Sequence, residues 1–131
     1  MLDKCKGCFA LSPDGSQIAF GENVDGQNSA VMTSLNGEKV RTIKLADQRG
    51  NLIQIEWLRD GSGIAYILAT DDFRQNTLWI QKFDGDAGPK TIAQFDQEIT
   101  PRGFALSPDG KSFAVSKGGW SHNMVLLKGL N

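Results

Sequence analysis

The chain has 131 residues, of which 40% are hydrophobic and 22% are charged, and this length is sufficient for one domain with a substantial core. Its formal net charge of -1 at pH 7 gives no excess of positive charge to attract nucleic acid or an anionic membrane, so we expect neither as a partner. No apolar stretch approaches the roughly 18 residues of a membrane span, and residues 1–8 lack the apolar core of a signal peptide. We therefore expect a soluble protein and assign no compartment.

The predicted elements begin with the segment Phe-Ala-Leu-Ser-Pro-Asp-Gly at residues 9–15. Its first three residues form a short apolar strand, and its last four are those that a type I turn prefers, with Pro13 at the second position and a glycine at the last. Because apolar residues resume at Ile18, the turn is predicted to join two strands of a hairpin. An identical heptapeptide occupies residues 104–110, and residues 55–61 form a degenerate third copy.

These copies define a long repeat. Gly61 lies 46 residues after Gly15, and Gly110 lies 49 residues after Gly61, a period typical of a propeller blade. Apolar runs and turns predict four strands in the first unit, at residues 9–11, 17–21, 30–35 and 39–45. They predict four in the second unit, at residues 54–58, 63–69, 77–83 and 91–95. The third unit has three, at residues 103–106, 112–117 and 124–127, and no fourth.

Two predictions about the strands depend on their burial or on their position in the repeat. The runs at residues 18–20, 64–68 and 113–115 are continuously apolar, which predicts strands covered on both faces by neighbouring sheets, with a small alanine at the centre of each run. The segment after Pro89 also fits helical spacing. We predict a strand there because it occupies the repeat position of residues 40–45.

The motif Phe-Ala-Leu-Ser-Pro-Asp-Gly-x-x-Ile-Ala-Phe, followed by an apolar strand and Asn-Gly or Asp-Gly, resembles the WD-repeat-like units of TolB-type β-propellers. The resemblance covers residues 9–130 and is weaker in the second unit, where Leu58 and Arg59 replace Ser-Pro. The final unit is similar to the C-terminal part of bacterial multidomain proteins that carry a kinase or winged-helix module ahead of a propeller. Neither module is present here, so the resemblance does not imply their activities.

The predicted fold class is all-β: a β-propeller made of four-stranded antiparallel blades, with about three blades and the last lacking its outer strand. We expect a single partial propeller domain over residues 1–131, with blades at about residues 9–45, 54–95 and 103–131. Three blades are too few for a ring, and the first and last sheets would expose apolar faces. We therefore expect either a piece of a longer propeller or a homodimer in which two copies supply six blades.

Cys5 and Cys8 form one Cys-x-x-Cys pair near the start of the chain. A zinc site needs two further ligands, and the single histidine, His122, would have to be joined by a carboxylate. A redox role is disfavoured because a strand, rather than a helix, follows the pair. We interpret the cysteines as sequence left from a preceding blade or linker, and we predict no metal site and no cofactor.

The acidic residues suggest no catalytic site. The turn position explains Asp14, Asp60 and Asp109, because a short Asp side chain bonds the local backbone there. Asp71 and Asp72 are adjacent on a loop and indicate a solvated corner. The sequence contains no nucleophile elbow, phosphate-binding glycine loop, zinc-protease motif or calcium loop, so we predict that the chain is not an enzyme.

Geometry favours one rim of the propeller as the binding site, because loops from second to third strands and loops between blades emerge on the same side. These loops are predicted at residues 22–29, 47–51, 71–76, 96–102 and 118–123. The side chains there that suit recognition or carry chemistry are Phe73, Arg74, Arg102, Trp120 and His122. The alternative for Phe73 and Trp120 is that they pack onto neighbouring blades, and for His122 that it is an ordinary surface residue.

Three functions remain open. The favoured one is a non-catalytic binding or scaffold module that offers its loop rim to a protein or small ligand. The second is an accessory, gating propeller segment of a hydrolase, such as a prolyl oligopeptidase-like peptidase, which requires a hydrolase domain elsewhere. The third is a truncated product without an independent role. The sequence upstream would separate the first two, because a kinase or winged-helix module indicates a sensor and a hydrolase indicates a gate.

Overall fold

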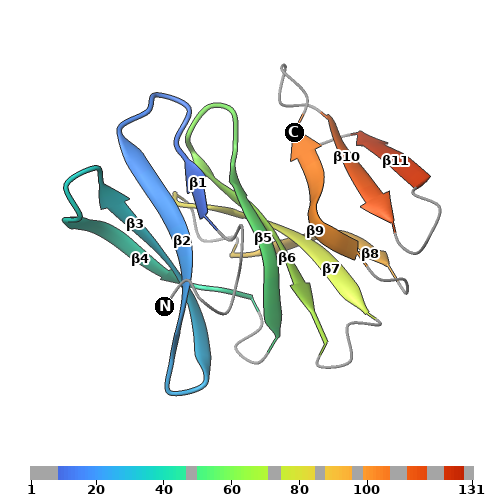
Figure 1. Cartoon of the computed structure of the whole chain (residues 1–131), viewed down its shortest axis with the longest axis horizontal. Coiled ribbons are helices and arrows are strands. Elements are labelled where there is room, and N and C mark those ends of the chain that lie inside the picture. Colours follow the sequence, from blue (N-terminus) through green and yellow to red (C-terminus); the bar gives the residue numbers. More distant parts are fainter. Residues whose placement is uncertain are drawn as a thin grey trace.

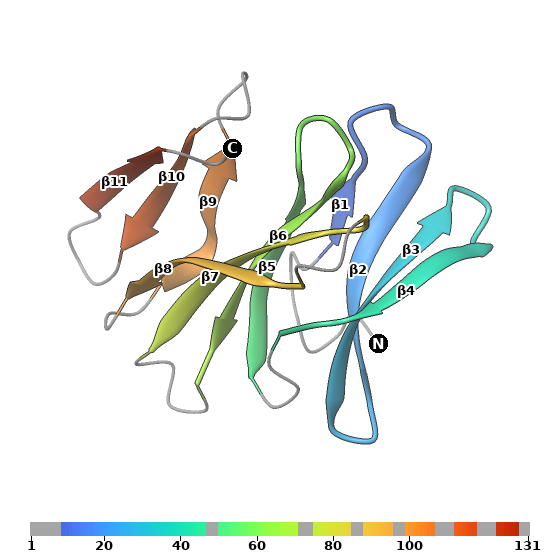
Figure 2. The same cartoon turned by 180° about the vertical axis from the view of Figure 1, so that it is seen from behind.

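The computed structural model describes residues 9–46, 50–70, 75–84, 88–95, 99–106, 112–117 and 123–128. Every regular element in these ranges is a β-strand, and the strands form three antiparallel sheets that follow one another along the chain (Figure 1; Figure 2 gives the reverse view). In the part of the chain that is described, no helix is long and apolar enough to span a membrane. The predicted all-β class and the repeated sheets are confirmed.

The first sheet has four strands in sequence order. They are β1 (Phe9–Leu11), β2 (Gln17–Val24), β3 (Gln27–Ser34) and β4 (Lys39–Lys44). The predicted loop at residues 22–29 was wrong, because β2 and β3 pair until a two-residue turn at Asp25 and Gly26. Their φ angles are 54° and 79°, and Asp-Gly with two positive φ angles is the hairpin turn whose twist matches the flanking strands. The hairpin therefore extends well beyond the apolar part of both strands.

The second sheet repeats this order. Its strands are β5 (Asn51–Trp57), β6 (Gly63–Ala69), β7 (Asn76–Lys82) and β8 (Lys90–Phe95). The segment after Pro89 is a strand, as its repeat position predicted. All seven residues of β6 are buried, which confirms that its continuous apolar run is covered on both faces. In β2, by contrast, Ala19 is buried while Ile18 and Phe20 are only half-buried, so the corresponding run of the first sheet is fully covered on one face alone.

The third sheet has three strands among the described residues, in the order β11-β10-β9. They are β9 (Ile99–Leu106), β10 (Ser112–Lys117) and β11 (Asn123–Lys128). The prediction that Arg102 belongs to a loop was wrong. Pairing between β9 and β10 continues past an irregularity between Val115 and Lys117, so that Ile99 pairs with Lys117 and Arg102 lies within β9.

The turns of the first two repeat units share one geometry. The Gly15 amide donates a 2.9 Å hydrogen bond to the Ser12 carbonyl, and the Gly61 amide donates a 2.9 Å bond to the Leu58 carbonyl. Both glycines have positive φ, 77° and 76° respectively, as the turn prediction required. The loss of Ser-Pro from the second unit therefore leaves the turn intact. The turn of the third unit lies at residues 107–110, outside the described residues.

The turn aspartates bond the local backbone, as predicted. Asp14 Oδ1 accepts hydrogen bonds from the Ser16 hydroxyl (2.7 Å) and amide (3.0 Å) and from the Ser12 hydroxyl (2.7 Å). These bonds, those from Ser16 foremost, lower the pKa of Asp14 to about 2. Asp60 accepts the same two bonds from Ser62, at 3.0 Å and 2.6 Å. The local hydrogen bonds thus account for both carboxylates.

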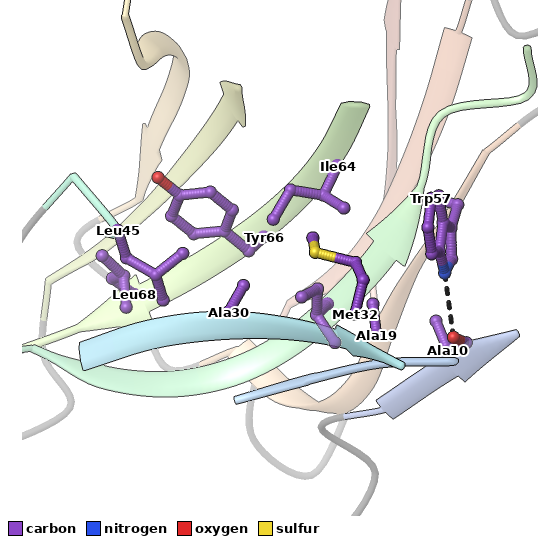
Figure 3. Close-up of a cluster of buried hydrophobic side chains, with 10 residues drawn as sticks. Ala10, Ala19, Ala30, Met32, Leu45, Trp57, Ile64, Tyr66 and Leu68 are labelled. Carbon is purple, nitrogen blue, oxygen red and sulfur yellow. Dashed lines mark hydrogen bonds between the residues drawn. The ribbon is translucent and has the colours of Figure 1, made fainter. Parts of the chain in front are cut away.

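Small side chains meet large ones in the core between the first and second sheets (Figure 3). The first sheet contributes Ala10, Ala19, Ala30 and Met32. The second contributes Ile55, Trp57, Ile64, Tyr66 and Leu68. A separate cluster, Ala65, Ile67, Leu78 and Ile80, covers the opposite face of the second sheet. The central alanines leave room for the bulky partners, so the first two sheets can approach closely.

Candidate functional site: the polar rim

Three connections of the first two sheets share one end of the structure, which we call the polar rim. They are the turn between β2 and β3, the connection from β4 to β5, and the connection from β6 to β7; the first of these lies at the lower edge of Figure 1. In an up-and-down sheet, alternate connections emerge at the same edge, which is why the repeat brings them together. The connections between β1 and β2 and between β5 and β6 lie at the opposite edge.

Asn28 anchors the first part of the rim. Its side chain is only 7% exposed, donates from Nδ2 to the Gly50 carbonyl, and accepts a 2.9 Å hydrogen bond from Asn23 Nδ2. The Asn28 carbonyl also accepts a 3.2 Å bond from the Leu45 amide. One buried amide side chain therefore ties the long hairpin to the segment that leads into the second sheet.

The second part of the rim is tied in the same way. Asn51 Nδ2 donates to the Thr70 carbonyl at 3.3 Å. Within the connection from β6 to β7, the Thr70 amide bonds the Gln75 carbonyl at 2.9 Å, and the Gln75 amide bonds Thr70 Oγ1 at 3.2 Å. Asn76, at the start of β7, is 1% exposed. The described part of the rim thus has two groups of hydrogen bonds, one around Asn28 and one around Thr70, at the adjacent residues Gly50 and Asn51.

The two buried asparagines occupy the same place in the repeat. Asn28 lies four residues before Met32, which pairs with Ala19. Asn76 lies four residues before Ile80, which pairs with Ala65 at the same position of the next unit. The sequence signal is therefore an asparagine four positions before the apolar residue that pairs with the central alanine, in each of the first two units. The predicted loop at residues 22–29 obscures this signal, because it excludes Asn28 from the third strand.

Tyr66 holds the connection between the first two sheets in place. Its hydroxyl accepts a 2.9 Å hydrogen bond from the Ala46 amide and donates a 2.6 Å bond to Gln81 Oε1. Gln81 Nε2 in turn donates to the Lys44 carbonyl at 3.0 Å. Burial raises the pKa of Tyr66 to about 12, so this hydroxyl stays protonated near neutral pH and acts as a fixed hydrogen-bonding group.

Glu56 is the half-buried carboxylate of the second sheet. Burial raises its pKa, an effect opposed by the hydrogen bond from Gln54, whose Nε2 lies 3.4 Å from Glu56 Oε1, and by the charge of Arg59.

Among the described residues, no group of three or more His, Cys, Asp or Glu side chains is placed to hold a metal ion. Side-chain hydrogen bonds of the described rim are made by the amides of Asn23, Asn28 and Asn51 and the hydroxyl of Thr70, groups that both donate and accept.

The structure does not test the predicted binding role of the rim residues. Phe73, Arg74, Trp120 and His122 lie outside the described residues, as do Cys5 and Cys8, and only the backbone of Arg102 is described. Among the described residues, hydrogen bonds place Leu45 and Gly50 beside Asn28 of β3, and Asn51 beside Thr70.

No family model matches the chain, and no curated protein matches it. Among solved structures it is similar to TolB from Acinetobacter baumannii, with 20% identity, a TM-score of 0.61, and coverage of 98% of this chain and 31% of that one. It is also similar to the β-propeller domain of the Trilobed protease from Pyrococcus furiosus, with 16% identity, a TM-score of 0.62, and coverage of 92% and 38%.

A third similar structure is KlAtg21 in complex with the coiled coil of AgAtg16, with 14% identity, a TM-score of 0.58, and coverage of 91% of this chain and 39% of that one. The chain thus spans between 31% and 39% of the length of these three chains. At these identities the similarity shows the fold, a β-propeller built of blades. The predicted resemblance to TolB-like propellers is confirmed.

Proposed function

We propose that the chain is a non-catalytic β-propeller module that binds a protein partner at the polar rim, either as a segment of a larger propeller or as a half propeller that assembles with a second copy. The observation that carries the proposal is the set of side-chain hydrogen bonds from Asn28 and Asn51, which tie the β2–β3 hairpin to Gly50 and the start of β5 to Thr70. A recognition surface that is already ordered loses less conformational entropy on binding.

The chemistry of the rim suits a peptide or protein ligand. The exposed residues Asn23, Gln27 and Gln75 present side-chain amides, which donate to carbonyl groups and accept from amide groups. The structure of KlAtg21 with a coiled coil shows that a similar fold engages a protein partner in that complex, which supports the proposal by analogy of fold.

A second function is favoured by one comparison. The similarity to the propeller domain of the Trilobed protease supports a role as an accessory or gating segment of a peptidase. This role places the catalytic groups in another domain, and the rim would then face that domain rather than an independent ligand.

Site-directed photocrosslinking tests the proposal. A photoreactive residue at Gln27, on the rim, is compared with one at Glu38, an exposed residue of the turn between β3 and β4, in cells of the source organism. The proposal expects a defined crosslinked protein from position 27 only, displaced by excess unlabelled chain. Equal crosslinking from both positions contradicts it. A crosslinked peptidase domain supports the gating role instead.

A further inference from the structure

We propose that the two outermost sheet faces of this chain are the two halves of one interface, through which two copies join head to tail into a closed ring of six blades. The inference deepens the proposed assembly with a second copy and rests on it. The buried interface between the first and second sheets has two halves. The repeat places one matching half on the outer face of the first sheet and the other on the outer face of the third sheet.

The first half of the buried interface is a row of two alanines and one longer aliphatic side chain across β1, β2 and β3. We call it the small row, and it consists of Ala10, Ala19 and Met32, which pair with one another across the sheet. Paired residues of neighbouring strands lie on the same face. All three side chains are buried, at 8%, 0% and 0% exposure, beneath the second sheet.

The third sheet repeats this row in the same register. Ala114 of β10 pairs with an alanine on β9, and with a leucine on β11. By register, Ala105, Ala114 and Leu126 therefore occupy the positions of the small row in the third sheet. Ala114 is only half-buried, whereas its counterparts Ala19 and Ala65 are 0% and 2% exposed. The third sheet thus places the same small row where its central alanine has less cover.

The second half of the buried interface is a set of large side chains on β5 and β6. Ile55 pairs with Tyr66 and Trp57 pairs with Ile64, and all four are buried against the small row. The same positions of the first sheet form what we call the large face. It consists of Phe9, Leu11, Ile18 and Phe20, in which Phe9 pairs with Phe20 and Leu11 with Ile18.

The large face is open in this chain. Phe9 and Leu11 are 57% and 60% exposed, and Ile18 and Phe20 are half-buried. In the second sheet, the equivalent residues are at most 7% exposed. In the second sheet, a small row covers the equivalent positions. The described part of this chain places no small row over the large face, so this surface remains exposed.

Figure 2 shows the first and third sheets at opposite ends of the molecule, with the second sheet between them. The large face belongs to the first sheet and the third small row to the last. One chain cannot join them, but a second copy carries both. A two-fold axis then forms both contacts at once, because a head-to-tail interface closes into a ring when its rotation allows. Six blades fall within the usual range of four to eight for propellers. The second copy is therefore the occupant that we assign.

The first measurement is the mass of the wild-type chain by analytical ultracentrifugation over a range of concentrations. The proposal expects a dimer that dissociates on dilution, with no larger species. A chain that stays monomeric at every concentration overturns the proposal and leaves the large face to a blade of a longer polypeptide. Neither result bears on crosslinking at the rim, so the two proposals fail independently.

Charge variants then test which faces meet. Leu11→Lys places an ammonium group on the large face, and Ala114→Lys places one on the third small row. Each should weaken dimerisation by at least roughly tenfold, because burying an unpaired charge in an apolar contact is costly. Thr91→Lys, at an exposed position of β8, is the matched control and should leave dimerisation unchanged. Circular dichroism checks that each variant is folded.

Mixing the two variants gives the sharpest result. Neither variant alone can form an intact contact, but the intact large face of Ala114→Lys can bind the intact small row of Leu11→Lys. The mixture should therefore recover a heterodimer with one contact, while the separate variants stay monomeric. A wild-type dimer that Leu11→Lys does not disturb, or a mixture that recovers nothing, overturns head-to-tail assembly.

Discussion

Trp57 Nε1 donates a 2.9 Å hydrogen bond to the carbonyl oxygen of Ala10, and this bond crosses from the second sheet to the first (Figure 3). The two residues are 47 positions apart in the sequence, which is close to one repeat. The same indole packs edge-on against Phe83 with ring centroids 5.8 Å apart, and Arg41 of the first sheet lies 4.1 Å above that ring. The hydrogen bond from Trp57 and the cation–π contact of Arg41 therefore join the first two sheets, and the Trp57–Phe83 contact holds the two second-sheet residues together.

Trp57→Phe should destabilise the fold, because it removes the indole donor and leaves the Ala10 carbonyl without this partner in a buried setting. The expected loss is about 1–3 kcal/mol in the free energy of unfolding, measured by urea denaturation. Trp79→Phe, at a half-buried position of β7, is the control for the loss of indole volume. Equal effects of the two substitutions would show that packing, rather than the hydrogen bond, dominates at position 57.

Gly15→Val should destabilise the first turn through backbone conformation alone. Gly15 has a φ of 77°, and a Cβ added there meets no atom within 4 Å, so steric crowding by neighbours does not contribute. A β-branched residue in this region costs about 1–3 kcal/mol, which thermal unfolding would detect. Gly15→Asn should cost less, because asparagine tolerates positive φ. An asparagine variant as unstable as the valine variant would contradict the conformational explanation.

Stability should depend on the ionisation of Asp14. Its pKa falls from 3.8 to about 2 on folding, chiefly through the Ser16 hydroxyl and amide. A depressed pKa means that the folded state favours the carboxylate, so its contribution is present above about pH 4 and is lost as the pH falls through about 2. The difference in unfolding free energy between wild type and Asp14→Asn should shrink over this range. Ser16→Ala removes the largest donor and should reduce the same pH dependence.

Tyr66→Phe should loosen the connection from β4 to β5. The substitution removes the acceptor of the Ala46 amide and the donor to Gln81, at a cost of about 1–3 kcal/mol for the groups left without partners. Hydrogen exchange at the Ala46 amide should accelerate more than exchange at the Gly15 amide, whose bond to Ser12 lies in a distant turn. Uniform acceleration at both sites would indicate a global effect instead.

The repeat made the fold predictable, because its signals are local. The glycine of the Asp-Gly turn recurs at positions 15 and 61 with nearly the same φ, and the alanine four residues later marks the centre of each buried strand. Local chemistry of this kind specifies turns and strand centres without reference to distant parts of the chain. The degenerate second unit could therefore be identified although its Ser-Pro pair is absent.

The rim was less predictable, because its contacts are not local. Asn28 bonds the Gly50 carbonyl 22 residues away, and the Asp25–Gly26 turn signal stands in a mostly polar run that lacks the regular apolar alternation of a paired strand. The start of β9 was also misplaced, since an irregularity in β10 extends the pairing to Ile99. Such features depend on how strands from different segments pair with one another. The alternation of polar and apolar residues within one segment does not reveal that pairing.

The alanine at the centre of each blade should tolerate enlargement only where no sheet covers it. Ala19 is 0% exposed beneath the second sheet, so Ala19→Leu should cost about 1–3 kcal/mol in unfolding free energy by overpacking. Ala114→Leu, at the equivalent but half-buried position of the third sheet, should change the unfolding free energy of the dilute, monomeric chain by much less. Urea denaturation at low protein concentration compares the two. Equal costs would mean that the third sheet is already covered, which contradicts an open small row at this end of the molecule.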